Sequence, residues 1–274
     1  MALVDTRINY FTPPPDGAKP YQWIDSGVEP RRNWTPVEFG VKAENVRGHE
    51  QEFTLDKSGF EFHHAPSPEK LFDDEERIKE VYYEDAINRI KEFTGASRVV
   101  IFDHTIRRPR PEGTPDTPEN RAPVKIAHVD QTPESATRRV HMHLPAEDVP
   151  ALLSKRFQII NLWRPIQNPA WQLPLALCDF QSVNDKKDEG DFVPTTLKYK
   201  DRDGETLSVK HSDAHKWKYL AGMSPDEIVL IKCFDSKLDG TVATFTPHTA
   251  IDVPTGPGTP ERQSIELRAL VFYD

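Results

Sequence analysis

The pattern of hydrophobic and polar positions divides the chain into one helical stretch and a longer series of short strands. Between about residues 73 and 94, apolar side chains recur at helical spacing, which predicts an amphipathic helix. Asp73 or Asp74 can cap the start of this helix, and Gly95 can end it. The positions that carry the pattern are Ile78, Val81, Tyr82, Ala86, Ile87, Ile90 and Phe93.

Short runs rich in β-branched and aromatic residues follow the helix almost to the end of the chain. Turn-forming pairs such as Asp203-Gly204 separate them, as is typical of neighbouring antiparallel strands. Strands are predicted at 98–103, 124–129, 156–163, 174–180, 192–199, 206–210, 227–234, 242–246 and 264–273. So many strands with few helices between them predict a mainly β fold with flanking helices, either a barrel or a two-sheet jelly roll.

The N-terminal segment differs from the rest in composition. Residues 1–60 combine prolines with aromatic residues, a mixture that disfavours helix but supplies side chains for burial. We therefore expect a single domain over 1–274. Its parts are an extended N-terminal arm at 1–60, a helical lead-in at 61–123 and a jelly-roll core at 124–274.

Composition and charge exclude several classes of partner. The chain has 274 residues, with 35 Lys and Arg against 44 Asp and Glu, and its net charge of -9 disfavours binding to nucleic acid or anionic lipid. It contains no run of 18 apolar residues, so no membrane-spanning helix is expected. Two cysteines and a start without a signal-peptide pattern predict a cytoplasmic protein.

His128 and Asp130 are the first candidates for chemistry. In an extended strand, residues i and i+2 point to the same face, so this pair places an imidazole beside a carboxylate. One further histidine would complete a two-histidine, one-carboxylate set, which binds Fe(II) and leaves positions open for a co-substrate and O2. A His-x-Asp pair alone is common, and its simpler interpretation is a solvated pair at the end of a strand.

A second group near the C-terminus strengthens this hypothesis. His248 comes after the apolar strand 227–234, and Arg262 and Ser264 open the last predicted strand. An oxygenase that uses 2-oxoglutarate needs a fixed cation for the distal carboxylate, and arginine offers that carboxylate two parallel hydrogen bonds. Ser264 lies two residues further along and can add a hydroxyl hydrogen bond. The combined pattern indicates Fe(II) and 2-oxoglutarate as cofactors.

Seven stretches resemble the fungal hydroxylase/desaturase family, which includes gibberellin desaturase and is related to the cephalosporin 7α-methoxylase subunit. They occur in the family's order over about residues 50–273. The stretches are FDHTIRR (102–108), AHVD (127–130), NLWRP (161–165), HKWKY (215–219), IKCFDS (231–236), PHTA (247–250) and RQSIELR (262–268). The resemblance implies a double-stranded β-helix (jelly-roll) oxygenase that depends on non-haem Fe(II) and 2-oxoglutarate and commonly serves secondary metabolism.

The resemblance also implies roles for single residues. The positions that match the family are His128, Asp130 and His248 as iron ligands, and Arg262 with Ser264 as the anchor for 2-oxoglutarate. Arg268 remains a rival anchor, because the interval from His248 to Arg262 is longer than is usual in this superfamily. His215 is the chief rival to His248. Asn161 and Arg164 are further candidates for the co-substrate site, and Arg164 could instead hold a substrate carboxylate.

The leading hypothesis is an Fe(II)- and 2-oxoglutarate-dependent oxygenase that uses O2 to hydroxylate or desaturate a small secondary metabolite. The sequence does not choose between these outcomes, and it leaves open whether the chain forms a homodimer. The alternatives are a non-catalytic jelly-roll binding module or partner subunit, and a cupin-type metalloenzyme that does not use 2-oxoglutarate. The residues Arg107, Arg108, Arg110 and Arg164 suggest a substrate that carries an anionic group.

Overall fold

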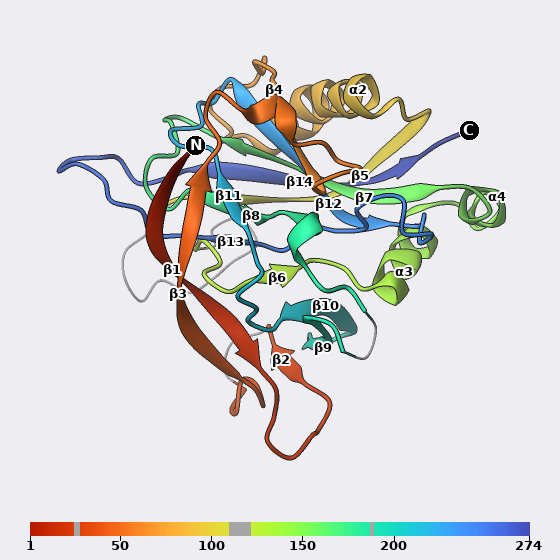
Figure 1. The fold of residues 1–274 in the computed structure, drawn as a ribbon. Coiled ribbons are helices and arrows are strands. Elements are labelled where there is room, and N and C mark those ends of the chain that lie inside the picture. The colour runs from red at the N-terminus through yellow and green to blue at the C-terminus, as the bar shows by residue number, and fades with distance from the viewer. Residues whose placement is uncertain (25–27, 110–121, 187–188) are drawn as a thin grey trace.

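Two β-sheets face each other, and a helix covers the outer side of the smaller one (Figure 1). The computed structural model describes residues 1–24, 28–109, 122–186 and 189–274. The larger sheet has the order β1 (Ala2–Thr12), β3 (Thr35–Asn45), β11 (Trp217–Tyr219), β8 (Leu175–Cys178), β13 (His248–Ala250), β6 (His128–Val129), β10 (Asp203–Val209), β9 (Phe192–Lys198) and β2 (Tyr21–Trp23). The smaller sheet has the order β4 (Phe60–His64), β12 (Glu227–Asp235), β7 (Phe157–Pro165), β14 (Ser264–Phe272) and β5 (Arg98–Arg107). The predicted mainly β jelly roll is confirmed.

Strands β7 and β14 form the centre of the smaller sheet and pair antiparallel along their whole length. Every residue of β7 is buried. Its side chains alternate between two layers: Ile159 and Trp163 pack between the sheets, whereas Ile160 and Leu162 pack against the helix. This burial on both faces is the reason that the sequence shows a continuous apolar run here.

The predicted helix at 73–94 is confirmed. It consists of α1 (Glu75–Arg77), a π-helical turn η2 (Ile78–Tyr82) and α2 (Tyr83–Thr94). Asp74 caps its start by accepting hydrogen bonds from two backbone N–H groups, and Gly95 ends it with a left-handed φ of 71°. Ile78, Tyr82 and Ile90 are buried against the smaller sheet, and burying side chains of this size stabilises a fold by about 1.5–3 kcal/mol each.

The segment 1–60 is more than an arm on the surface. β1 and β3 form an antiparallel pair with 11 residues in register, and β3 then pairs in parallel with β11, so the hairpin is part of the larger sheet. Its buried residues Ile8 and Tyr10 pack with Trp217 in a third apolar cluster. The prolines of the segment made strands hard to predict, but most of them lie between β1 and β3, where they interrupt no pairing.

Several predicted elements differ from the structure. The segment 242–246 is buried but irregular, and the strand lies just beyond it, at β13. Of 124–129 only β6 is a strand. The sequence analysis also missed strands β2, β4 and β11 and two short helices, α3 (Pro133–His143) and α4 (Val149–Leu153). A start signal for α3 is present in the sequence, because Thr132 and Ser135 form a capping box with Pro133 between them.

Candidate active site

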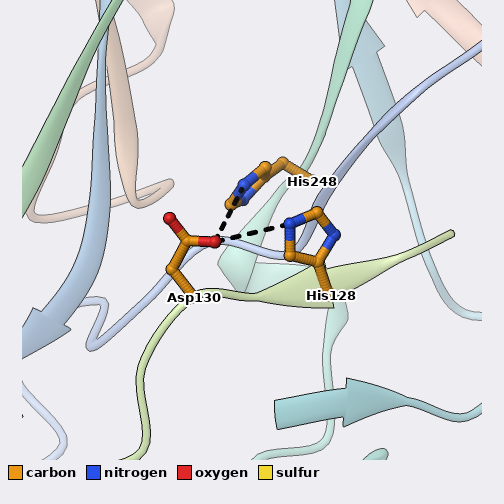
Figure 2. A group of neighbouring side chains, drawn as sticks. All are labelled: His128, Asp130 and His248. Atoms are coloured by element: carbon orange, nitrogen blue, oxygen red, sulfur yellow. Dashed lines mark ion pairs between the residues drawn. The ribbon is translucent and has the colours of Figure 1, made fainter. Parts of the chain in front are cut away.

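Three side chains from two neighbouring strands meet at one end of the space between the sheets. β6 and β13 pair antiparallel so that His128 lies directly opposite His248, and Asp130 follows β6 on the same side (Figure 2). One potential ligand atom from each residue lies within 4.8 Å of the other two. The Asp130 Oδ1 atom is 3.4 Å from His128 Nε2 and 3.9 Å from His248 Nε2. The structure therefore brings the predicted iron ligands together.

Both imidazoles are held in the same orientation by the backbone. The Nδ1 atom of His128 is 2.8 Å from the carbonyl oxygen of Ile126, and Nδ1 of His248 is 3.0 Å from that of Thr246. A carbonyl can only accept, so each Nδ1 carries a proton, and each Nε2 is the ring atom that faces Asp130 and can bind a metal once it is free of a proton. This arrangement is typical of histidines that bind a metal.

Asp130 is held by two donors on the smaller sheet. Its Oδ2 atom accepts hydrogen bonds from Asn161 Nδ2 at 2.8 Å and from Arg268 Nε at 3.1 Å, which leaves Oδ1 facing the histidines. Burial by itself would raise the pKa of Asp130, but the charges of Arg268 and the two histidines lower it well below its usual value. Asn161 thus positions a candidate ligand from beside the cavity.

The charges of the three side chains also affect the two imidazoles. Burial opposes protonation of His128, but the hydrogen bond and charge of Asp130 outweigh it and raise the pKa of His128. The pKa of His248 is lowered by burial and by His128. His248 is therefore neutral near pH 7. Two imidazole nitrogens and one carboxylate oxygen fit non-haem Fe(II), because this set leaves coordination positions open.

A cavity of about 340 Å³, part of it open to solvent, adjoins these three residues and contains Arg262. Arg262 is 5% exposed; its Nη1 donates to the carbonyl oxygen of Leu173 at 2.7 Å, but its Nε has no partner among the described residues. The hydroxyl of Ser264, 1% exposed, also has no partner there. Burial, followed by the nearby charge of Arg107, lowers the pKa of Arg262 to about 9. A buried cation and a free hydroxyl fit an anionic ligand such as a carboxylate.

Arg268, the rival anchor, already has its charge neutralised. Its guanidinium lies 3.1 Å from Asp130, 3.4 Å from Asp103 and 3.4 Å from Glu266. Burial lowers the pKa of Arg268, but these three carboxylates outweigh it and raise the pKa above its usual value. Between the two arginines, Arg262 is the one without a carboxylate partner among the described residues, which favours it as the anchor.

Arg164 does not lie in the cavity. It is buried on the opposite face of β7, where its Nε donates to the hydroxyl of Tyr82 at 3.2 Å and its Nη1 to the carbonyl oxygen of Pro225 at 2.6 Å. Side chains alternate along a strand, so Asn161 and Trp163 share the face of the site whereas Arg164 shares the helix face. The predicted co-substrate or substrate role for Arg164 is therefore corrected to a structural one.

His215 also lies away from the candidate ligands. Its ring contacts Asp191 at 3.0 Å and the hydroxyl of Tyr10 at 3.3 Å, beside the apolar cluster around Trp217. Burial lowers the pKa of His215, and the hydrogen bond that its ring makes to the Asp191 carboxylate opposes this effect. The structure thus gives His215 a packing role and leaves His248 beside His128.

A second, wider cavity of about 1130 Å³, also open in part to solvent, is lined by two of the three candidate metal ligands, His128 and Asp130. It shares Arg107, His128, Asp130 and Arg268 with the first cavity, so the candidate metal position lies where the two cavities meet. The sequence analysis missed two arginines that line its outer part, Arg139 of α3 and Arg202 in the turn between β9 and β10. No local motif marks them, because only the tertiary fold brings them together.

Comparison with known proteins identifies relatives over nearly the whole chain. Residues 8–272 match a family described as "Oxidoreductase/YMDC permease-like domain". The hydroxylase/desaturase efuI of Hormonema carpetanum is 36% identical over 288 residues, covering 99% of this chain and 95% of that protein. The hydroxylase/desaturase CTB9 of Cercospora beticola is 32% identical over 287 residues, covering 98% and 87%. The Fe(II)/2-oxoglutarate-dependent dioxygenase nvfI of Aspergillus novofumigatus is 31% identical over 252 residues, covering 88% and 84%.

Solved structures show the same fold. The iron and alpha-ketoglutarate-dependent endoperoxidase NvfI superimposes with a TM-score of 0.86 at 24% identity, covering 99% of this chain and 98% of that chain. A variant of that enzyme gives a TM-score of 0.88 at 25% identity, with the same coverage. The jelly-roll fold and these relatives together define an Fe(II)- and 2-oxoglutarate-dependent dioxygenase. Within this class, the chain belongs to the fungal hydroxylase/desaturase family.

The described part of the chain contains no helix long and apolar enough to cross a membrane.

Proposed function

We propose that His128, Asp130 and His248 bind Fe(II), and that Arg262 and Ser264 bind the distal carboxylate of 2-oxoglutarate. The observation that carries this proposal is the arrangement of the narrower cavity. Three metal-ligating side chains lie at one end of it, and a buried guanidinium without a carboxylate partner among the described residues lies in the same cavity. A dicarboxylate fits such a cavity, because one end can bind the metal while the other neutralises Arg262.

Fe(II), when bound with 2-oxoglutarate and O2, supplies the oxidising power to remove hydrogen from a substrate C–H bond, with release of succinate and CO2. The residues of the chain position the reactants. The backbone carbonyls of Ile126 and Thr246 fix the two imidazoles, while Asn161 and Arg268 fix Asp130. Trp163 and Leu175 line the narrower cavity with apolar surface, which limits the access of water.

The wider cavity is the proposed place of the organic substrate. It is lined by His128 and Asp130 and by many side chains that the narrower cavity lacks, which leaves room for a small organic molecule beside the co-substrate. The relatives named hydroxylase/desaturase support either hydroxylation or desaturation as the outcome. The substrate that we propose is the small secondary metabolite that the sequence resemblance implies. The net charge of -9 supports an enzyme that acts on neither nucleic acid nor membranes, and the two cysteines support a reducing, cytoplasmic setting. We propose one oxygenase domain, since residues 1–60 complete the larger sheet.

The test is iron binding together with succinate release by the purified protein. The wild-type protein should bind one Fe(II) and convert 2-oxoglutarate to succinate in the presence of O2. His128→Ala should lose both properties and remain folded, because it removes a ligand at a strand end. His141→Ala changes an exposed histidine of α3 and serves as the control, which should keep both. Iron binding and succinate release by His128→Ala at the wild-type level would refute the assignment.

A further inference from the structure

The wider cavity is lined by more arginines than carboxylates, although the protein has a net charge of -9. Four arginines line this cavity, against the carboxylates of Asp103 and Asp130. Two of the four are already engaged: Arg268 pairs with three carboxylates, and Arg107 donates to the carbonyl oxygen of Ala122 at 2.7 Å. The remaining two, Arg139 and Arg202, therefore decide the charge of the outer cavity.

The guanidinium groups of Arg139 and Arg202 lie over aromatic rings and not beside carboxylates. The guanidinium carbon of Arg139 is 5.1 Å from the centre of the Phe102 ring, and that of Arg202 is 4.4 Å from the centre of the Tyr199 ring. Within the described parts of the chain, neither guanidinium forms a hydrogen bond or an ion pair. An aromatic ring attracts and orients a guanidinium but leaves its charge and its N–H donors available to another group.

The charges around Arg139 do not cancel. Burial lowers the pKa of Arg139, Arg202 and Arg268 lower it further, and Asp103 is the carboxylate that opposes them. The same surroundings act on His143, whose pKa is lowered by burial and by the charge of Arg139. An anion in this part of the cavity would relieve the repulsion, and low-dielectric walls would strengthen its attraction to Arg139, which is half-buried, more than to Arg202, which is exposed.

The remaining walls of the cavity are mixed, with aliphatic and aromatic side chains beside uncharged polar ones such as Gln22 and Thr195. Ile24, Ile126 and Leu197 contribute aliphatic surface, and Trp34 and Tyr199 contribute rings. The Nε1–H group of Trp34 has no acceptor among the described residues, although the side chain is buried. The cavity thus combines apolar and aromatic surface with several available donors.

We propose that the organic substrate carries a carboxylate on an apolar, ring-containing skeleton, and that Arg139 and Arg202 bind this carboxylate. The skeleton then fills the apolar part of the cavity and extends toward His128 and Asp130. Arg139 and Arg202 act as specificity-determining residues, distant from the co-substrate anchor Arg262. The inference rests on the proposed function in one respect, namely that the wider cavity holds the substrate.

The test compares carboxylic acids with their uncharged amides, which have the same shape. Benzoate and benzamide, naphthoate and naphthamide, and anthracene carboxylate with its amide are titrated into the metal-free protein, and binding is followed by tryptophan fluorescence. The acid of at least one pair should bind at least about 10-fold more tightly than its amide, because a hydrogen bond to a charged group contributes about 1.5–3 kcal/mol. Equal binding within every pair, or no binding of any acid, would overturn the proposal.

Three variants assign the preference to the two arginines. The double variant Arg139→Gln/Arg202→Gln should bind acid and amide within about 2-fold of each other, whereas Arg139→Lys, which keeps the charge, should retain part of the preference. Arg138→Gln is the matched control, because Arg138 is the neighbouring residue on α3, is exposed, and already pairs with Glu205 at 3.3 Å. An acid preference that survives in the double variant, or that disappears in Arg138→Gln, would overturn the proposal.

A separate measurement distinguishes this proposal from the proposed function. Under anaerobic conditions, Fe(II) and 2-oxoglutarate bound together give a visible charge-transfer absorption. This absorption should be the same in the wild-type protein and in the double variant, since neither arginine contacts the narrower cavity. Its absence from the wild-type protein would refute the proposed function, while the acid preference of the metal-free protein is measured independently of it.

Discussion

Two buried clusters of charged side chains lie in this molecule, and they differ in how completely their polar atoms are used. The first surrounds Lys232 of β12, which is fully buried and donates to Asp56, Asp235 and the carbonyl oxygen of Ala243, each at 2.8 Å. Asp235 in turn accepts two hydrogen bonds from Arg156 and one from Gln158. Every donor of the Lys232 ammonium has an acceptor, so this cluster needs no ligand.

The second cluster is the candidate active site, where polar atoms remain without partners. The guanidinium Nε of Arg262, the hydroxyl of Ser264 and the amide oxygen of Asn161 are buried and have no hydrogen-bond partner among the described residues. Leaving a buried polar atom without a partner costs about 1–3 kcal/mol, so a fold retains such atoms where a ligand satisfies them. The comparison teaches that burial and charge alone do not mark a functional site. Atoms without a partner mark it here because they gather beside the candidate metal ligands, whereas Arg164 Nη2, which also has no partner among the described residues, lies on the helix face of β7.

The largest expected effect is on the stability contributed by the first cluster. Lys232→Met leaves the buried carboxylate of Asp235 without one of its cations and should lower the free energy of unfolding by about 3–5 kcal/mol. Iron affinity of the folded fraction should not change, because Lys232 does not line the cavity at the metal ligands. Denaturant unfolding and Fe(II) titration measure the two quantities. If Lys232→Met lost iron affinity but kept its stability, the Lys232 cluster would belong to the functional site, and the comparison would be wrong.

The next effect concerns the support of a metal ligand. Asn161→Ala removes one of the two donors that hold Asp130 Oδ2 and should weaken Fe(II) binding about 10–100-fold, as is usual for residues that orient metal ligands. Fe(II) affinity is measured by anaerobic titration, with Gln158→Ala as a control, because Gln158 supports Asp235 in the other cluster. Equal iron affinity in wild type and Asn161→Ala would show that Asn161 does not position Asp130.

The smallest effect is the acid sensitivity of the first cluster. Burial would raise the pKa of Asp235, but Arg156 and Lys232 lower it below its usual value. A carboxyl whose pKa is lowered in the folded state stabilises the fold above its unfolded pKa, near 3.9, and this contribution is lost as the pH falls through the folded value. Asp235→Asn should therefore reduce the dependence of stability on pH below about 4, by at most about 1.4 kcal/mol per pH unit. Asp213→Asn, at a fully exposed position, is the control and should leave that dependence unchanged.

Much of the fold could be predicted because buried elements leave a strong pattern of apolar residues in the sequence. The helix ending at Gly95 and the central strands β7, β12 and β14 bury apolar residues at regular spacing, and that spacing is visible in the sequence. The N-terminal hairpin and β13 could not be predicted in this way. β13 has only three residues, and the hairpin's place in the sheet depends on pairing with β11, far along the chain.

The candidate site was predictable where it rests on local geometry. The i, i+2 relation of His128 and Asp130 and the order of His248, Arg262 and Ser264 identified residues that the fold brings together. The same relation predicts that Asn161 and Arg164 face opposite sides of β7, so Arg164 could have been excluded from the sequence alone. The arginines of the wider cavity could not be found, because their meeting depends on α3 and on a turn that lie 63 residues apart in the sequence, at Arg139 and Arg202.

The central claim is that incomplete pairing at Arg262 marks the binding site of 2-oxoglutarate. The most direct test is an anaerobic titration of the Fe(II)-loaded protein with 2-oxoglutarate, followed by the visible charge-transfer absorption, in wild type, Arg262→Gln and Arg164→Gln. Both arginines are buried and both lie at the smaller sheet, but only Arg262 lines the cavity. The account predicts that Arg262→Gln weakens 2-oxoglutarate binding at least about 10-fold, because a charge-assisted contact is lost. Arg164→Gln should leave the binding unchanged. Unchanged binding in Arg262→Gln, or an equal loss in Arg164→Gln, would contradict it.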